Sequence, residues 1–558
     1  MAARRKVASA GLRLPDLWTV LTLAALAVLA IFVLWPLANV FTASFYGEFS
    51  GSLGLENYAT FFGSGYFRRA LWHSLFTSAM GTLLALALGL PLAVIAARYD
   101  FVGKAALRVL VLLSLISPPF IGAYAWIMLL GRQGLVTQAL AGIGIGLPTI
   151  YGAPGIILVT ALNLYPLVFL LVHGALLRID RSLEEASLGL GRTRFQTFRS
   201  ITLPLTLPAM ATGALLVFLG VLSDFGTPAL LGENYPVLAT LAFTLFLSEI
   251  GGNPAMASTT SVVLVTVALV LILLQRWVAS RRNYATDAIN RPEILRMAGW
   301  QRFAFPAFAW GLMAIANLPL VIIVYTSFLE TSGPVFLQSF SLDSYRQVFH
   351  LVRGAIVNSF AFSGMALALI VVTGSVVGYI ISRRDTMLTR VLDTALMIPY
   401  VIPGTVLGIG FITAFNQPPI WITGTVAIIV AAYFIRRLPY MVRACASYVY
   451  QIDRSVEEAS INLGAPPGKT FMKIMLPLMA PGILAGAVLA WVEVINELSA
   501  TVVLYTGTTS TMPIATYSQV LAGSYGPAAA VASLLILATT LSLVLFTVIG
   551  GSDRELTV

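Results

Sequence analysis

The sequence predicts an all-α protein that crosses a membrane many times and consists of two homologous halves. Hydrophobic residues make up 58% of the 558 residues, charged residues only 10%, and the mean hydropathy is +0.90. Soluble domains carry about 25% charged residues, so the composition excludes an ordinary soluble protein. The second observation is a polar stretch that occurs twice, at 179–204 and at 452–477, with fifteen of its twenty-six positions identical. We name these stretches the first and the second island.

Twelve apolar runs are long enough to cross a membrane. About 20 apolar residues span roughly 30 Å of hydrocarbon, and the backbone must satisfy its own hydrogen bonds in lipid, so each run is predicted to be a helix. The first run follows a basic N-terminus and exceeds the roughly 7–15 apolar residues of a signal peptide, which predicts an uncleaved span. The predicted spans lie near 17–39, 70–96, 105–131, 155–177, 205–231, 257–279, 303–328, 355–381, 391–414, 419–442, 480–505 and 527–549.

Basic residues are distributed unevenly between the two sides of these spans. With the N-terminus placed in the cytoplasm, 26 of the 33 Lys and Arg residues fall in cytoplasmic segments and five fall on the opposite side, while Arg436 and Arg437 are ambiguous. This asymmetry follows the positive-inside rule. The net charge of +10 therefore indicates membrane topology and not a nucleic-acid partner. Both islands and both termini are predicted to be cytoplasmic.

The duplication extends beyond the islands. Pro118 matches Pro403 at an offset of 285 (403 − 118), whereas Pro166 matches Pro439 at an offset of 273 (439 − 166), so the first half carries a 12-residue excess between Pro118 and Pro166. Both halves are predicted to have six helices in the same orientation. Parallel repeats place a transport pathway at the interface between the halves. We predict a first half at 1–279, a cytoplasmic linker at 280–302 and a second half at 303–558.

Each island has the pattern of a short helix in a loop. Ser182 and Glu185 have the S-x-x-E spacing of a capping box, which starts a helix. Gly191 suits the turn that ends it, since glycine tolerates positive φ, and Ala186 is small enough for close contact with a partner surface. The alternative is an ordinary surface loop, which gives little reason for Glu-Glu-Ala, Gly and Leu-Pro to stay in register between the copies. The equivalent positions in the second island are Ser455, Glu458, Gly464 and Ala459.

At these residues the sequence resembles the integral permeases of binding-protein-dependent ABC importers, of the MetI-like, type I class. In that family a loop with the EAA signature forms a coupling helix that sits in a groove of an ATPase subunit. Pro466-Pro467 in the second island replaces Thr193-Arg194 of the first, so the two docking sites are expected to differ in geometry. The resemblance implies ATPase-coupling roles for Glu184, Glu185, Ala186 and Gly191, and for Glu457, Glu458, Ala459 and Gly464, each set followed by Leu-Pro.

Two copies of this signature in one chain resemble the fused permeases of the ferric-iron importer group, as do the segments 223–227, 436–440 and 496–501. The resemblance implies two cytoplasmic ABC ATPase subunits that use ATP and Mg, a substrate-binding protein on the outer face, and residence in a bacterial inner membrane. It favours ferric iron as the substrate. The alternatives are the same kind of permease for 2-aminoethylphosphonate, a phosphorylated sugar or thiamine, and, from another class, a secondary transporter with parallel repeats.

Ionisable side chains at membrane depth are the candidate pathway residues, because they are expensive there and usually functional. Asp224 lies deep in the fifth predicted span and Glu497 at the equivalent position of the eleventh. Glu493, Asn496 and Glu497 are spaced i, i+3 and i+4 and would share one helix face. The carboxylates either attract a cation into the pathway or pair with arginines of another helix. The predicted pathway residues are Asp224, Glu493, Asn496, Glu497, Arg436 and Arg437.

The sequence indicates no catalytic, nucleotide or metal site. The segment 464–470 resembles a phosphate-binding loop, but that motif needs four residues between its glycines and a preceding strand, and here there are three. The single Cys445 supports neither an internal disulfide nor a metal cluster, and His73, His173 and His350 are scattered. We therefore predict a permease subunit that is not an enzyme and binds no cofactor, with ATP hydrolysed by separate subunits.

Overall fold

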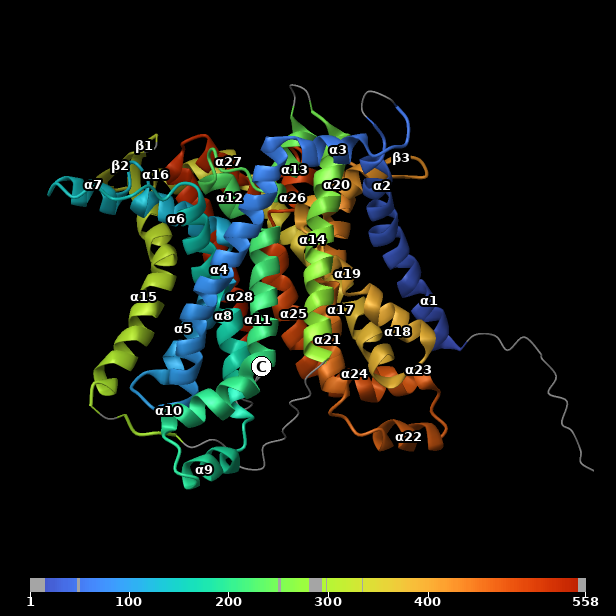
Figure 1. The fold of residues 1–558 in the computed structure, drawn as a ribbon. Coiled ribbons are helices and arrows are strands. Elements are labelled where there is room, and N and C mark those ends of the chain that lie inside the picture. The colour runs from blue at the N-terminus through green and yellow to red at the C-terminus, as the bar shows by residue number, and fades with distance from the viewer. Residues whose placement is uncertain are drawn as a thin grey trace, which may run out of the picture.

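The computed structural model is almost entirely helical (Figure 1) and describes residues 16–47, 51–248, 252–280, 294–297, 299–333 and 335–549. Most of the predicted linker 280–302 lies outside these residues, as do the basic N-terminal segment and the last nine residues. The helices of the first half are α1 (Leu17–Leu29), α2 (Trp35–Ser44), α3 (Glu56–Gly63), α4 (Gly65–Arg98), α5 (Lys104–Ile116), α6 (Pro119–Leu130), α7 (Leu135–Ala141), α8 (Ala153–Leu177), α9 (Arg181–Gly189), α10 (Arg194–Thr197), α11 (Leu203–Ser223), α12 (Gly226–Leu231), α13 (Leu238–Leu247) and α14 (Pro254–Ser280), with π-helical turns η1 (Ala30–Leu34) and η2 (Phe198–Thr202).

The second half repeats this order in outline, with two small hairpins, one of them in place of α7, and with the span equivalent to α11 divided into two helices. Its helices are α15 (Gln301–Ser327), α16 (Asp343–Leu351), α17 (Arg353–Arg383), α18 (Met387–Ala395), α19 (Ile398–Val401), α20 (Gly404–Phe415), α21 (Val426–Val449), α22 (Ser455–Asn462), α23 (Pro467–Thr470), α24 (Leu476–Leu478), α25 (Ala480–Ile495), α26 (Thr501–Leu504), α27 (Met512–Leu521) and α28 (Tyr525–Ile549), with the π-helical turn η3 (Phe471–Met475). The strands β1 (Leu329–Ser332) and β2 (Val335–Phe340) pair antiparallel, as do β3 (Asn416–Gln417) and β4 (Ile420–Trp421).

The prediction of a multi-span helical membrane protein is confirmed, but the spans are less regular than expected. In the described part of the chain, eight helices are long and apolar enough to cross a membrane, or up to eleven if each of three bent pairs counts as one span. The tenth predicted span, 419–442, corresponds to α21, which carries three arginines in its length and is not among them. The count of twelve stays a prediction.

Prolines explain two of the three bends. The pair α5–α6 is bent by 97° and the pair α18–α20 by 107°. Each break falls on a proline with an extended backbone, Pro118 in the first half and Pro403 in the second. Because a proline also pushes its preceding residue out of the helical region, a helix ends there. Pro118 and Pro403 occupy equivalent positions in the two halves, so the helix break is part of the duplication.

The first helix of each half packs against the other half (Figure 1). Trp18 of α1 contacts Tyr379 of α17, with ring centroids 4.8 Å apart, and Asp16 pairs with Arg384. In the reciprocal contact, Phe305 of α15 meets Tyr99 at the end of α4, with centroids 4.9 Å apart. The apolar core therefore forms two clusters that each combine helices of both halves. The halves are interlocked.

Glycines allow the long helices to cross closely. α4 packs against α8 and α17 packs against α21. A Cβ added to Gly89 of α4 would lie 2.8 Å from the carbonyl oxygen of Tyr165, and one added to Gly374 of α17 would lie 2.4 Å from the side chain of Met441. Gly89 and Gly374 occupy equivalent positions (374 − 89 = 285), so the close crossing is also duplicated.

We expect Gly378→Ala to destabilise the protein and Gly364→Ala, on the same helix, to leave it unchanged or slightly more stable. A Cβ at Gly378 would lie 2.7 Å from Cys445 Cβ and 3.0 Å from the carbonyl oxygen of Val442, whereas a Cβ at Gly364 meets nothing within 4 Å. Overpacking costs about 1–3 kcal/mol, while Gly to Ala in an open helix position gains up to about 1 kcal/mol. Thermal unfolding in detergent measures both variants, and equal midpoints would contradict the close crossing.

Candidate functional site

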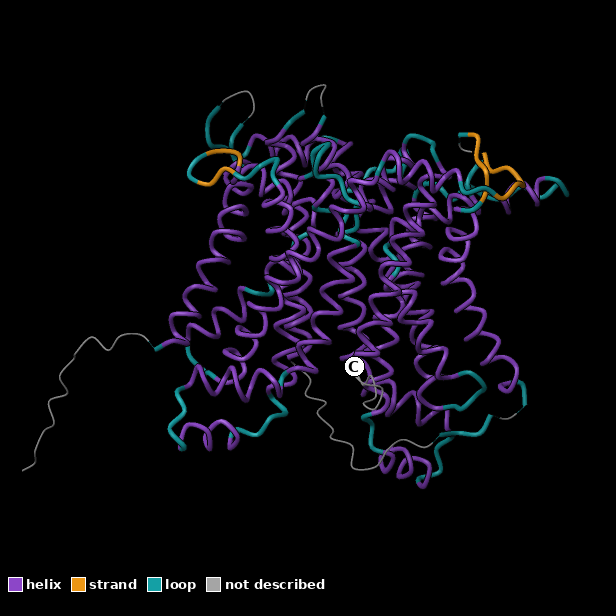
Figure 2. The backbone as a smooth tube through the Cα atoms, turned by 180° about the vertical axis from the view of Figure 1, so that it is seen from behind, coloured by secondary structure: helices purple, strands orange, loops and turns teal. Residues whose placement is uncertain are grey.

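The two islands lie at the same end of the helix bundle, which we call the island end (Figure 1). α9 and α10 project from the first half, and α22 and α23 from the second. The hairpins β1–β2 and β3–β4 and the helices α3 and α13 lie at the opposite end (Figure 2). The prediction that both islands face one side of the membrane therefore agrees with their placement.

The predicted capping boxes are wrong, although each helix starts within two residues of the expected place. Asp180 caps α9, because its Oδ1 accepts hydrogen bonds from the backbone N–H and the hydroxyl of Ser182, at 2.9 and 2.8 Å. Asp453 accepts from the backbone N–H of Ser455 at 2.8 Å, and this bond holds the pKa of the Asp453 carboxyl below its usual range. An aspartate two residues earlier competes for the same donors and carries a charge that suits a helix N-terminus.

The two islands have the same fold, contrary to the expectation of different geometry. α10 and α23 start and end at equivalent residues, although Thr193 begins the first with a capping box and Pro467 begins the second as its first helical residue. In both islands a serine hydroxyl lies 2.9 Å from a threonine hydroxyl, Ser187 to Thr197 and Ser460 to Thr470. Proline at N1 needs no donor and is preorganised for a helix, so two different sequences start the same turn. Only the surface chemistry differs.

Gly191 and Gly464 end the island helices as predicted. Their φ angles are +83° and +86°, in the left-handed region that glycine adopts without a Cβ penalty. A Cβ at either position would meet nothing within 4 Å. A larger residue at either glycine would therefore be strained by its backbone alone, without disturbing the helix bundle.

The paired glutamates of each island point in different directions. Glu184 forms a two-pronged ion pair with Arg98, at 2.8 and 2.5 Å, and the exposed fractions of these side chains are 19% and 8%. Glu457 pairs with Arg383 through a single bond, Nε to Oε1 at 2.7 Å, while Arg383 Nη2 donates to the carbonyl oxygen of Ile452 at 2.7 Å. The next residue in each island, Glu185 or Glu458, is exposed, as are Ala186 and Ala459. One glutamate holds the island to the bundle, and its neighbour faces outward.

Each island also exposes apolar side chains, which are not among the coupling residues predicted from the sequence. Leu190 is 84% exposed and Leu463 at the equivalent position is 89% exposed. Leu183 and Leu188 of the first island are exposed as well, and so are their equivalents Val456 and Ile461. The sequence could have indicated this surface, because both copies of the polar stretch have large apolar residues at the same positions. Duplicated exposed apolar residues are typical of a binding surface.

The predicted pathway residues of the second half form a compact charge cluster. The Glu497 carboxylate is 3% exposed and lies 2.6 Å from Arg436 Nη1 and 2.7 Å from Arg437 Nη2. Arg437 Nη1 also contacts Glu493 at 2.9 Å. Two arginines and two glutamates give a cluster with no net charge. The sequence left two hypotheses open, namely that the carboxylates attract a cation or that they pair with arginines of another helix. For Glu493 and Glu497 this geometry corresponds to the second.

Asp224, Asn496 and Glu497 do not lie within continuous helices, contrary to expectation. α11 ends at Ser223 and α25 ends at Ile495, so each residue lies at a break before a short helix. Asp224 Oδ1 accepts from the backbone N–H of Gly226 at 3.0 Å, and Glu497 Oε1 accepts from that of Ala500 at 2.9 Å. These carboxylates hold the backbone at the start of α12 and just before α26. Two buried oxygens, Asp224 Oδ2 and Asn496 Oδ1, have no hydrogen-bond partner.

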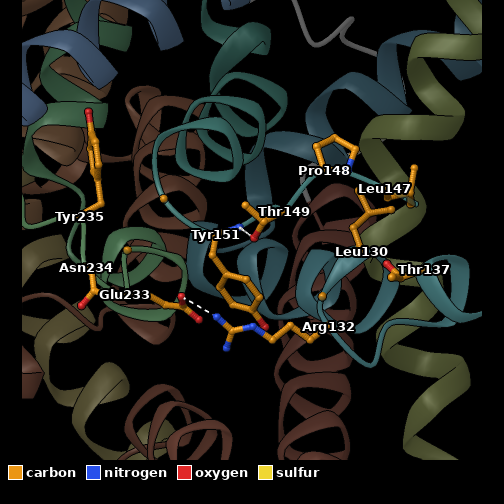
Figure 3. A pocket seen from close by; sticks show the side chains of 13 residues that line it. Leu130, Arg132, Thr137, Leu147, Pro148, Thr149, Tyr151, Glu233, Asn234 and Tyr235 are labelled. Atoms are coloured by element: carbon orange, nitrogen blue, oxygen red, sulfur yellow. Dashed lines mark hydrogen bonds and ion pairs between the residues drawn. The ribbon is translucent and has the colours of Figure 1, made fainter. Parts of the chain in front are cut away.

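A cavity of about 560 Å³ lies at the opposite end of the first half (Figure 3). Its wall includes Arg132, which pairs with Glu233 at 2.9 Å and lies over the ring of Tyr151, with Arg132 Cζ 4.9 Å from the centroid. Glu233 has a φ of +41°, which is strained for a side chain of this kind. The cavity borders the segment that contains the 12-residue excess of the first half. None of the predicted site residues lines it.

No group of three or more His, Cys, Asp or Glu residues in the described part of the chain is arranged to hold a metal ion. His73 stacks on Tyr235, with ring centroids 3.6 Å apart, and its Nδ1 lies 3.0 Å from the carbonyl oxygen of Pro236.

Comparison with known proteins identifies the class. Residues 89–284 and 370–552 match the family described as "Binding-protein-dependent transport system inner membrane component". The chain belongs to this family and contains two copies of its domain. It is therefore a multi-pass permease of the inner membrane and a transport component that is not itself catalytic.

Two relatives are similar over most of the chain. The chain is 31% identical to the ferric transport system permease protein FbpB of Actinobacillus pleuropneumoniae, over 95% of this chain and 78% of that protein. It is 30% identical to the putative ferric transport system permease protein FbpB 1 of Haemophilus influenzae, over 86% and 76%. Among solved structures, a bacterial alginate ABC transporter in complex with a pentasaccharide-bound periplasmic protein matches 48% of this chain and 95% of that chain, at 24% identity and a TM-score of 0.41.

We expect Glu497→Gln to destabilise the permease far more than Glu493→Gln. The first change leaves two buried guanidinium groups facing a neutral amide, and breaking a buried pair costs roughly 3–5 kcal/mol. Glu493 is 40% exposed, and pairs near the surface contribute below about 1 kcal/mol. The free energy of unfolding in mixed micelles measures both changes. Equal losses would mean that the cluster does not depend on the buried carboxylate.

Proposed function

We propose that the chain is the permease subunit of an ATP-driven importer of ferric iron. The observation that carries this proposal is its similarity to ferric transport permeases over as much as 95% of the chain, at 31% identity. Two ATPase subunits would dock at the islands, and a substrate-binding protein would dock at the opposite end. The excess of Lys and Arg next to the island end supports a cytoplasmic location for that end and for both termini.

The islands support two equivalent docking sites. Each presents an outward glutamate, a small alanine and three exposed apolar side chains on one short helix and the residue that follows it, and each lies at the same end of the bundle. An apolar patch with a charge at its edge suits a groove on a partner protein. Closure of the ATPases on ATP would push both coupling helices and change which side of the membrane the pathway faces, as a rigid-body change between two states.

The charge cluster leaves fewer residues that favour a cation as the substrate. Arg436 and Arg437 neutralise Glu493 and Glu497, so these acids contribute no net negative charge to a pathway. Asp224 is the remaining carboxylate of the predicted set, and its Oδ2 has no partner. A carboxylate that is not neutralised by an arginine favours a cation over an anion. The substrate assignment therefore depends mainly on the relatives and, within the chain, on Asp224.

We expect Gly191→Val and Gly464→Val to reduce the retention of ATPase subunits and to lower transport, while the protein still inserts and folds. Valine would be strained at a φ near +85°, and no packing inside the bundle would change, because a Cβ there meets nothing. The expected cost at each site is about 1–3 kcal/mol. Co-purification from detergent measures docking, and Gly364→Val is the matched control on an open helix surface.

Full ATPase retention by both island variants would contradict the docking assignment. A wild-type chain that never retains an ATPase, and that transports without ATP, would identify a secondary transporter instead. Glu185→Lys and Glu458→Lys test the same surface by charge, whereas Glu184 and Glu457 are unsuitable probes because they are paired inside the structure.

We expect Asp224→Asn to lower iron uptake while the ATPases stay bound. The amide is nearly isosteric and its oxygen can still accept from the backbone of α12, so the change removes charge with little change in shape. Uptake of ferric iron by reconstituted complex with its binding protein measures the effect. Unchanged iron uptake would remove Asp224 from the pathway. Uptake of a phosphonate, a sugar phosphate or thiamine in place of iron would move the assignment to one of those substrates.

A further inference from the structure

The helices α4 and α17 are each tied to an island by a residue at one end. Arg98 is the last residue of α4 and pairs with Glu184 in α9, and Arg383 is the last residue of α17 and pairs with Glu457 in α22. The paired residues lie 86 and 74 positions apart in the sequence. The ion pairs therefore connect each island to a helix that does not adjoin it in the chain.

The same two helices are tied to a second segment at their other end. Ser74 Oγ of α4 accepts a hydrogen bond from the backbone N–H of Leu238 at 2.8 Å, and Ser359 Oγ of α17 accepts from that of Met512 at 2.7 Å. The donors are the first residues of α13 and α27. The contact is thus the same in both halves.

The residue before each serine adds another bond of the same kind. His73 Nδ1 lies 3.0 Å from the carbonyl oxygen of Pro236, and Asn358 Nδ2 donates to the carbonyl oxygen of Ser510 at 2.9 Å. Because a carbonyl oxygen only accepts, the His73 Nδ1 must carry the proton. Histidine and asparagine differ in shape, yet both halves keep a side-chain donor to the same carbonyl. The hydrogen bond to this carbonyl oxygen is therefore present in both halves, although the residue that donates it differs.

The segments held in this way begin at the pathway carboxylates. The first segment runs from Asp224 through α12 to Leu238, and the second runs from Glu497 through α26 to Met512; each carboxylate accepts a backbone hydrogen bond near the start of its segment. Each segment thus has a buried carboxylate at its start and a hydrogen bond to α4 or α17 at its end. A shift of α4 or α17 along its axis would move the end of that segment.

The length and packing of α4 and α17 suit the transfer of motion. The serine and the arginine are 24 residues apart in both helices (98 − 74 and 383 − 359), which corresponds to about 36 Å of helix at 1.5 Å per residue. Gly89 and Gly374 bring α4 and α17 into close contact with α8 and α21. A closely packed helix moves as a body, because packed interiors have low compressibility.

We propose that Arg98 and Arg383 are positioning residues that couple each island, through α4 or α17, to the segment that begins at Asp224 or Glu497. This inference rests on the proposed function, in which ATPase subunits move the islands. The buried, two-pronged pair of Arg98 with Glu184 resists both pulling and rotation, because two parallel N–H to oxygen bonds define one orientation. The coupling runs over the full thickness of the bundle in each half.

The test uses the full chain assembled with its ATPases and binding protein in proteoliposomes. Spin labels at the equivalent exposed positions Asn234 and Gly507, in a Cys445→Ala background, report the distance between the two segments with and without nucleotide. The double variant Glu184→Gln with Glu457→Gln removes both ion pairs at constant side-chain volume. Arg390→Gln is the control, because it breaks an exposed ion pair with Asp385 that no part of this coupling uses.

In the double variant we expect the ATPases to remain bound and to hydrolyse ATP, the nucleotide-dependent distance change to be lost, and uptake to fall about tenfold. Exchanging the charges, by Arg98→Glu with Glu184→Arg and Arg383→Glu with Glu457→Arg, should recover part of the distance change and part of the uptake. Ser74→Ala with Ser359→Ala breaks the other end of the helices, far from the ATPases, and should give the same loss.

Several outcomes would overturn the inference. One is an unaltered distance change in the glutamine variant, and another is loss of ATPase binding there, which would assign the ion pairs to the shape of the docking surface. A third is normal uptake in the serine variant. A wild-type chain that binds no ATPase subunits would overturn the proposed function as well. A nucleotide-dependent distance change without iron uptake would overturn only the assignment of iron as the substrate.

Discussion

Charged side chains inside an apolar helix bundle must find their partners within the protein, and much of this structure follows from that constraint. Glu184 and Glu457 are held by Arg98 and Arg383, while Glu497 is held by two neighbouring arginines of α21. An isolated carboxylate in such surroundings would cost several kcal/mol or take up a proton. The chain therefore places its acids where an arginine or a row of backbone N–H groups already points. Those places are the ends and breaks of helices.

Helix breaks are consequently where the permease concentrates its polar chemistry. Pro118 and Pro403 interrupt one pair of spans, and Asp224 and Glu497 occupy the interruption of another. Backbone groups freed by a break need donors and acceptors, and in a membrane these are acceptable only where protein surrounds them. Both breaks are present in each half, so the duplication repeats the polar groups at the breaks as well as the helices.

The interlocking of the halves determines how an island can influence the rest of the molecule. α1 packs on the second half beside Arg383, and α15 packs on the first half beside Arg98. Each ion pair between an island and a long helix therefore lies next to a helix of the other half. Motion of one island is constrained by both halves, which favours a concerted change over independent movement of two six-helix units.

The sequence by itself determined the class of fold, the duplication, the positions of the islands and the glycines that end their helices, because composition and local backbone preference are properties of short segments. It also identified the charged residues of the cluster. Only the tertiary structure decided which glutamate of each Glu-Glu pair points inward, since Glu184 and Glu185 are the same residue type and only Glu184 meets Arg98 of α4. The same holds for the hydrogen bonds that Ser74 and Ser359 accept, whose donors lie more than 150 residues away in the chain. Spacing along a chain predicts helix faces, but which helix ends meet is decided by packing over the whole bundle.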